Sequence, residues 1–129
     1  MAAFISLSDS ATANLLSAMS TLAQDTDVAD FTVTCCDKTW RLHSTILAVR
    51  SPFFKAAITN NFTEKLEMTM GIKDLDPETM DEVINYMYGK PIGNAPVNFL
   101  LEAAQRFQMI DLKEDVIKLA KQRMSSDYV

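Results

Sequence analysis

The chain has 129 residues, 48% of them hydrophobic, and a net charge of −5 from 12 basic and 17 acidic side chains. This length and apolar content suffice for one hydrophobic core, so we expect a single domain. The acidic balance, without a dense run of lysine or arginine, argues against direct binding of nucleic-acid phosphates.

The amino-terminal residues do not have the pattern of a signal peptide or a membrane span. Residues 1–20 lack a basic leading region, and serine, aspartate and asparagine interrupt their apolar positions. The two cysteines, Cys35 and Cys36, are adjacent, which does not fit a disulfide framework. We therefore expect a protein of the cytoplasm, the nucleus or both, without a membrane partner.

The first half of the chain predicts a helix, a hairpin of two strands and two further short helices. Apolar residues recur at helical spacing in the helices, and polar and apolar residues alternate in the strands around a turn at Cys36-Asp37. Proline is favoured in a first helical turn, so Ser51-Pro52 marks the start of a new helix. The predicted ranges are about 9–23, 30–35, 38–42, 43–50 and 52–59.

The second half predicts a third strand and three helices. Residues 67–72 form the strand, and Asp76-Pro77-Glu78 supplies an N-cap, a first-turn proline and a first-turn acid for the next helix. Glycines and prolines predict a loop over 89–96. The last helix is predicted to have Asp111 as its N-cap, with Glu114 three residues later. A small mixed sheet flanked by a cluster of short helices is an α+β fold.

His43 is the only histidine of the chain, and its surroundings do not predict a catalytic or a metal site. No set of nucleophile, base and orienting group can be assembled around it. A zinc site needs four convergent ligands, and Cys35 and Cys36 would point to opposite faces of a strand, one to the core and one outward. We therefore expect no cofactor, no enzymatic activity and a structural, hydrogen-bonded role for His43.

Several blocks of the sequence resemble, in the same order, the signature of the BTB/POZ family. They are Asp30-Phe31-Thr32-Val33, Trp40-Arg41-Leu42-His43, residues 46–54, residues 72–78, Tyr86-Met87-Tyr88-Gly89 and Leu101-Glu102-Ala103-Ala104. The resemblance implies a BTB/POZ domain over 27–124, preceded by a segment 1–26 with a dimerisation helix and followed by a tail 125–129. Members of this family are non-catalytic interaction modules, commonly dimeric, and many adapt substrates to cullin-3 ubiquitin ligases.

The resemblance also implies roles for individual residues. In the family, a helix that precedes the domain packs across a two-fold axis against the partner's helix that begins at the junction histidine. The dimer interface implied in this way contains Leu15, Met19, Leu22 and Ile46. From the residues alone, the alternative is that the amino-terminal helix docks onto the chain's own core. The family pattern further suggests that His43 caps the junction near Asp30.

Cullin-3-binding members carry an apolar-x-Glu tripeptide in the loop after the short Ser-Pro helix, and Phe62-Thr63-Glu64 occupies that place. An aromatic ring is a large binding anchor, and the carboxylate of Glu64 can fix the register of the partner. The alternative is that Phe62 is an isolated exposed apolar residue without a role. Many family members that repress transcription carry lysine or arginine after the junction histidine. Ser44 at this position predicts an acidic or neutral pocket and disfavours that type of module.

The resulting hypothesis is a homodimeric adaptor that links substrates to a ubiquitin ligase through the amino-terminal domain of cullin-3. One alternative is a dimerisation or scaffolding module of a transcriptional or other regulator, without a ligase role. The other is a monomeric adaptor of the elongin C or Skp type, which shares the fold. Phe62-Thr63-Glu64 disfavours the first alternative, and the amino-terminal helix together with Ser51-Pro52 disfavours the second.

Overall fold

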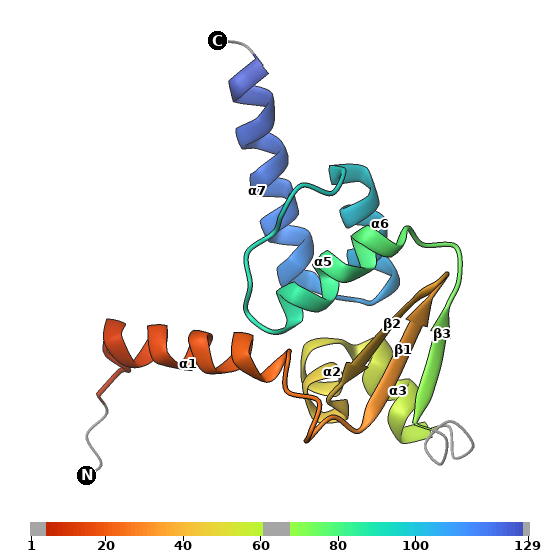
Figure 1. Ribbon diagram of the computed structural model, residues 1–129. Coiled ribbons are helices and arrows are strands. Elements are labelled where there is room, and N and C mark those ends of the chain that lie inside the picture. The colour runs from red at the N-terminus through yellow and green to blue at the C-terminus, as the bar shows by residue number, and fades with distance from the viewer. Residues whose placement is uncertain (1–4, 61–67, 128–129) are drawn as a thin grey trace.

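The computed structural model describes the backbone of residues 5–60 and 68–127, and the side chains of 5–59 and 68–124. It has an α+β fold in which helices flank a small mixed sheet, as the sequence predicts (Figure 1). The elements are, in order, α1 (Asp9–Leu22), β1 (Phe31–Cys35), β2 (Lys38–Leu42), α2 (Ser44–Arg50), α3 (Pro52–Asn60), β3 (Thr69–Ile72), α5 (Pro77–Met87), α6 (Val97–Arg106) and α7 (Ile110–Asp127).

The sheet has the strand order β2-β1-β3. β1 pairs antiparallel with β2 in a hairpin and parallel with β3, so that Val33 lies between Trp40 and Met70. The residues of β1 alternate between buried and half-buried, which places Phe31, Val33 and Cys35 in the core. Cys36 lies in the hairpin turn with a positive φ of 56° and is exposed, so the predicted opposite orientations of the two cysteines are confirmed.

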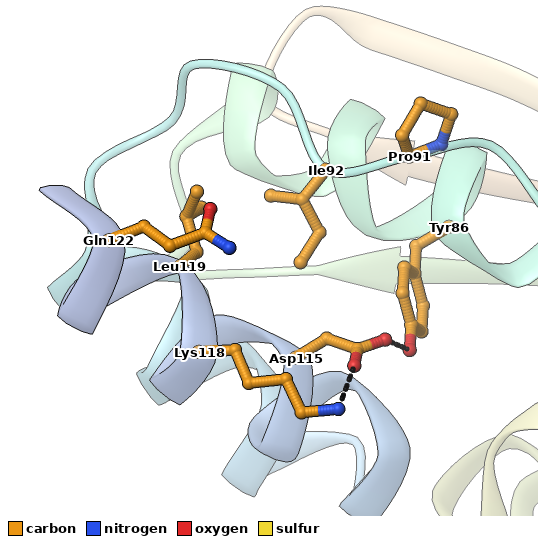
Figure 2. A pocket seen from close by; sticks show the side chains of 7 residues that line it. All are labelled: Tyr86, Pro91, Ile92, Asp115, Lys118, Leu119 and Gln122. Atoms are coloured by element: carbon orange, nitrogen blue, oxygen red, sulfur yellow. Dashed lines mark hydrogen bonds and ion pairs between the residues drawn. The ribbon is translucent and has the colours of Figure 1, made fainter.

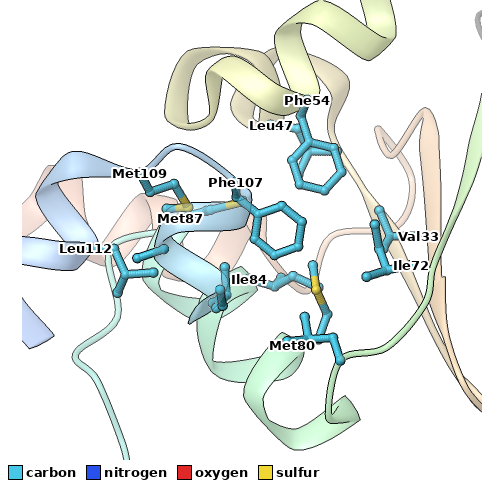
Figure 3. Packing of buried hydrophobic residues seen from close by; sticks show 14 of the residues in the cluster. Val33, Leu47, Phe54, Ile72, Met80, Ile84, Met87, Phe107, Met109 and Leu112 are labelled. Atoms are coloured by element: carbon cyan, nitrogen blue, oxygen red, sulfur yellow. The ribbon is translucent and has the colours of Figure 1, made fainter. Parts of the chain in front are cut away.

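The hydrophobic core lies where side chains of the sheet meet those of the helices (Figure 3). Phe54 of α3 stacks on Phe107 after α6, with ring centroids 5.3 Å apart. Between them, the hydroxyl of Ser51 donates to the carbonyl oxygen of Phe107 at 2.8 Å and accepts from the amide of Phe54 at 3.3 Å. The Ser51-Pro52 junction is therefore tied to the end of α6 by both aromatic packing and hydrogen bonds.

The predicted caps differ in outcome. The carboxylate of Asp76 accepts from the amide of Thr79 at 3.1 Å, so the N-cap predicted for α5 is confirmed. The N-cap predicted at Asp111 is wrong, because α7 begins at Ile110 and its first turn is closed by the amide of Lys113 donating to the carbonyl of Met109. Asp111 instead pairs with Arg50 of α2 at 2.8 Å, which ties α2 to α7.

Helix α1 projects away from the body of the domain (Figure 1). It ends one residue earlier than predicted, and the hydroxyl of Ser8 caps it by accepting from the amide of Ala11 at 3.0 Å. All residues of α1 are described, and none of them is buried. Across the described residues, no helix combines the length and apolar content that a bilayer span requires.

Candidate interaction surface

The apolar side chains of α1 are divided between the body and the outside. Met19 and Leu22 are partly buried and pack against the core. Leu15 and Leu16 remain 54% and 47% exposed. The carboxyl-terminal half of α1 therefore docks on the chain's own core, whereas a dimer contact of the exposed leucines in its middle stays a prediction.

A hollow of about 320 Å³ lies between α1 and the body. Its lining residues are Leu15, Leu16, Met19, Arg50, Met87 and Gly89. Of the residues predicted for the dimer interface, Leu15 and Met19 thus border this hollow, whereas Leu22 and Ile46 pack partly buried against the core. We call Leu15, Leu16, Met19, Leu22 and Ile46 the seam.

Leu16 and Gly89 were not part of the predicted interface. Leu16 lies in the same apolar pattern as Leu15 and could have been included. Gly89 follows the end of α5 with φ +87°, a conformation that favours glycine. A Cβ atom at Gly89 would lie 3.1 Å from Cδ2 of Leu16 and 4.0 Å from Cβ of Met19, so α1 approaches the backbone closely here. The sequence did not point to Arg50, because its place at the hollow depends on how α2 packs in the fold.

His43 is only 5% exposed, and its hydrogen-bond partners differ from those predicted. Its Nδ1 lies 2.7 Å from the hydroxyl of Tyr88, and its Nε2 lies 3.1 Å from the carbonyl oxygen of Asp25. Its side chain makes no capping hydrogen bond to α2 within the described residues. His43 does occupy the N-cap position of α2, at the predicted junction, but its side chain bonds Tyr88 and Asp25 and leaves the capping of α2 to Asp30.

Asp30 provides the cap that was predicted for His43. Its carboxylate accepts from the amide of Ser44 at 2.7 Å and from the hydroxyl of Ser44 at 2.6 Å. Burial alone would raise the pKa of Asp30, but the hydrogen bonds from the hydroxyl and the amide of Ser44 outweigh burial and lower the pKa below its ordinary value. The carboxylate thus stays charged at the amino terminus of α2, where an anion is favourable.

A second hollow, of about 310 Å³, lies between α5, the loop that follows it and α7 (Figure 2). The hydroxyl of Tyr86 donates to Asp115 at 2.6 Å, and the amine of Lys118 lies 3.9 Å from the same carboxylate. Burial and the bond to Asp115 raise the pKa of Tyr86. Ile92 and Leu119 supply apolar wall. Asp115 thus contacts both Tyr86 and Lys118 at this hollow.

The loop over this hollow is held from two sides. Glu82 of α5 accepts from the amide of Ala95 at 3.0 Å, and Arg123 of α7 donates to the carbonyls of Gly93 and Ala95 at 3.1 and 3.3 Å. A Cβ atom at Gly93 would collide with Oε1 of Glu82, so a larger residue here would require this carboxylate to move. The second hollow therefore has a fixed wall.

The remaining predictions concern metals and cullin-3. Across the described residues, no three His, Cys, Asp or Glu side chains gather closely enough to hold a metal ion. Burial raises the pKa of the Cys35 thiol, and its Sγ donates to the carbonyl of Leu75 at 3.2 Å. Phe62 and Glu64, the residues predicted to bind cullin-3, lie outside the described residues.

The sequence is similar to the amino-acid sequences of Kelch-like proteins. Kelch-like protein 38 of Homo sapiens is 31% identical over 103 residues, which are 78% of this chain and 18% of that protein. Kelch-like protein 17 of Mus musculus is 30% identical over 103 residues, which are 78% of this chain and 16% of that protein. The chain thus spans less than a fifth of the length of these curated relatives.

Solved structures of low sequence identity share the fold. The BTB (Tramtrack and Bric a brac) domain of human Gigaxonin superposes with a TM-score of 0.74 at 17% identity, covering 92% of this chain and 98% of the Gigaxonin chain. The BTB domain of zebrafish PATZ1 has a TM-score of 0.72 at 15% identity, covering 93% and 99% of the two chains. A family model described as BTB/POZ domain matches residues 19–123. This match spans most of the sequence, and the chain therefore belongs to the BTB/POZ domain family.

Proposed function

We propose that this protein is a homodimeric interaction module that links substrates to a cullin-3 ubiquitin ligase. Membership of the BTB/POZ family supports a role in protein interaction. The observation that carries the homodimer is the seam, in which the exposed Leu15 and Leu16 stand on a helix that projects from the body.

The composition of α1 supports pairing with a second copy of the chain. Asp9 is the only charged residue between Asp9 and Leu22. Two such helices can approach each other across a two-fold axis without repulsion between like charges. A solvent-facing helix ordinarily carries charges on its outer face, so a neutral helix with exposed leucines fits an interface better than it fits water.

The cullin-3 part of the proposal rests on the place of Phe62 and Glu64 in the sequence. They follow directly on α3, which ends at Asn60 and is anchored in the core through Phe54. Large aromatic side chains are common binding anchors at protein interfaces. We propose that Phe62 is this anchor and that Glu64 contributes at the rim of the contact.

Two measurements on purified protein test the two parts of this function. Light scattering gives the mass, and a dimer is expected in dilute solution. Calorimetric titration of the cullin-3 amino-terminal domain compares the wild type with Phe62→Ala and with Phe99→Ala, a control ring on α6 that is 39% exposed. Loss of an anchor ring should weaken binding about thirtyfold, and the control should bind like the wild type.

The outcomes separate the alternatives. A dimeric wild type that gives no heat with the cullin domain would refute the ligase role and leave a dimerisation or scaffolding module. A monomeric wild type would refute the homodimer and favour an adaptor of the elongin C or Skp type. Equal affinity of Phe62→Ala and wild type would remove Phe62 as the anchor. Early melting of Phe62→Ala would show instead that the ring belongs to the core.

A further inference from the structure

We propose that His43 is a positioning residue that sets the direction in which α1 leaves the body. This inference rests on the proposed dimer, because the direction of α1 matters for function only if α1 forms the interface. It is carried by a chain of hydrogen bonds that runs from the end of α1 through Asp25 and His43 to Tyr88.

The fixed end of this chain is Tyr88, the fully buried C-cap of α5. Its hydroxyl oxygen accepts from the backbone amide of His43 at 3.1 Å and lies 2.7 Å from Nδ1 of the same residue. Burial raises the pKa of Tyr88 to about 12. The hydroxyl therefore keeps its proton at neutral pH, and it holds both the backbone and the ring of His43.

These partners determine the tautomer of His43. The carbonyl of Asp25 can only accept a hydrogen bond, so Nε2, at 3.1 Å, must carry the proton. The Tyr88 hydroxyl already accepts the His43 amide, and its own hydrogen is satisfied when it donates to Nδ1. The neutral Nε2–H form thus satisfies every donor and acceptor in the chain, and the imidazole acts as a rigid link between Tyr88 and Asp25.

The other end of this hydrogen-bond chain is α1. The amide of Asp25 donates to the carbonyl of Leu22, the last residue of the helix, at 3.0 Å. The peptide that follows binds His43, so the end of α1 is held in place by the imidazole. Further along the linker, Arg41 donates to the carbonyl of Ala29 at 3.2 Å, which fixes the start of β1 independently.

A second point of attachment explains why the hydrogen bond from His43 to Asp25 would set the direction of α1. The backbone of Gly89, the neighbour of Tyr88, lies so near Leu16 in the middle of α1 that a Cβ atom there would be 3.1 Å from the leucine Cδ2. Leu16 and Leu22 are six residues apart, a distance of about 9 Å along a helix axis. Because α1 is held at one point by Gly89 and at the other by His43, a shift of about 1 Å at the His43 end turns the helix by roughly 6°. Both contacts converge on the Tyr88–Gly89 corner of α5.

Two substitutions separate the contact of His43 with Tyr88 from its contact with Asp25. In His43→Asn, the amide group reaches the position of Nδ1 and retains a partner for Tyr88, but the donor to Asp25 is lost. In His43→Gln, the longer side chain places an amide nitrogen near the position of Nε2 and restores that donor. We expect the dimer dissociation constant, measured by sedimentation, to rise at least about fivefold in His43→Asn. His43→Gln should recover part of the loss, because it restores the donor to Asp25 but not the acceptor for the Tyr88 hydroxyl.

Two readouts do not depend on the dimer. Long-range ¹H–¹⁵N spectra of the wild type should show the neutral Nε2–H tautomer; the Nδ1–H form would overturn the proposal even if every variant failed to fold. Hydrogen exchange of the Asp25 amide should accelerate in His43→Asn and not in His43→Gln. Equal exchange and equal dimer affinity in the two variants would also overturn the proposal. A monomeric wild type with the expected tautomer and exchange pattern would refute the dimer and leave His43 as the residue that positions α1.

Discussion

Truncating the two exposed leucines of the seam, Leu15 and Leu16, to alanine tests the dimer with a magnitude that follows from the structure. The side chains are 54% and 47% exposed, so a partner can bury about half of each. Burying a whole leucine contributes roughly 1.5–3 kcal/mol, and the exposed half contributes about 1 kcal/mol. A two-fold interface contains each leucine twice, so the double variant should lose about 4 kcal/mol, or about a thousandfold in dissociation constant.

The assay is sedimentation over a concentration series, paired with thermal melting of the same samples. Ile110→Ala on α7 is a matched control, because this isoleucine is 73% exposed and lies outside the seam. The double variant should become monomeric at concentrations where the control and the wild type are dimeric. The melting temperature extrapolated to low concentration should hardly change, since Leu15 and Leu16 contribute little to the monomer core.

An unchanged dissociation constant in the double variant would refute the seam as the interface. An equal loss in the Ile110→Ala control would show that general surface hydrophobicity, and not the seam, drives association. If the double variant instead melts early as a monomer, the two leucines stabilise the fold of a single chain, and the docking of α1 on its own core extends further than its exposure indicates.

Three further changes have expected outcomes. Asp30→Asn should weaken the dependence of unfolding free energy on pH in the acid range. The lowered pKa of Asp30 stabilises the wild type above the ordinary carboxyl value of 3.8, and this stability is lost as the pH falls through the lowered pKa. Equal loss of stability in the two proteins, in melts at several acid pH values, would contradict this. Ser51→Ala should lower the unfolding free energy by about 1–3 kcal/mol in denaturant titrations, because the carbonyl of Phe107 and the amide of Phe54 lose a buried hydrogen-bond partner. Ser10→Ala, at an exposed serine, is the control. Equal unfolding free energies of the two variants would contradict a structural role of the Ser51 hydroxyl. Gly89→Ala should lower the melting temperature, because φ is +87°, and should also weaken the dimer, because the new Cβ would crowd Leu16. An unchanged dimer dissociation constant would contradict the close approach of α1 to Gly89.

Local pattern was enough to place the strands and most helices. The alternation of Phe31, Val33 and Cys35 reflects a strand with one buried face, which is a property of neighbouring residues. The start of α7 could not be read in this way. Gln108 adopts a positive φ of 58°, and Met109 supplies the first carbonyl of the helix, so the N-cap predicted at Asp111 lies two residues too late.

Local sequence patterns did not predict hydrogen bonds between residues that are far apart in the chain. His43 and Tyr88 are 45 residues apart, and no periodicity relates the end of β2 to the end of α5. Asp30 lies close to His43 in the fold, but its carboxylate is taken by Ser44, whose hydroxyl and amide are both donors. A basic residue in place of Ser44 would keep the amide donor but lack the hydroxyl, so one of the two hydrogen bonds to Asp30 depends on the serine.

Two adjacent residues, Tyr88 and Gly89, position α1 in different ways. Tyr88 contributes a hydroxyl that must be present, because the backbone and ring of His43 both bind it. Gly89 contributes the absence of a side chain, because Leu16 approaches its backbone and its φ is positive. A change at Tyr88 would therefore release the end of α1 near Leu22, whereas a change at Gly89 would push its middle near Leu16. If the proposals for His43 and the seam hold, both changes alter the direction of the same helix and leave the leucines of the seam in place, so the geometry of the proposed interface is lost without loss of its residues.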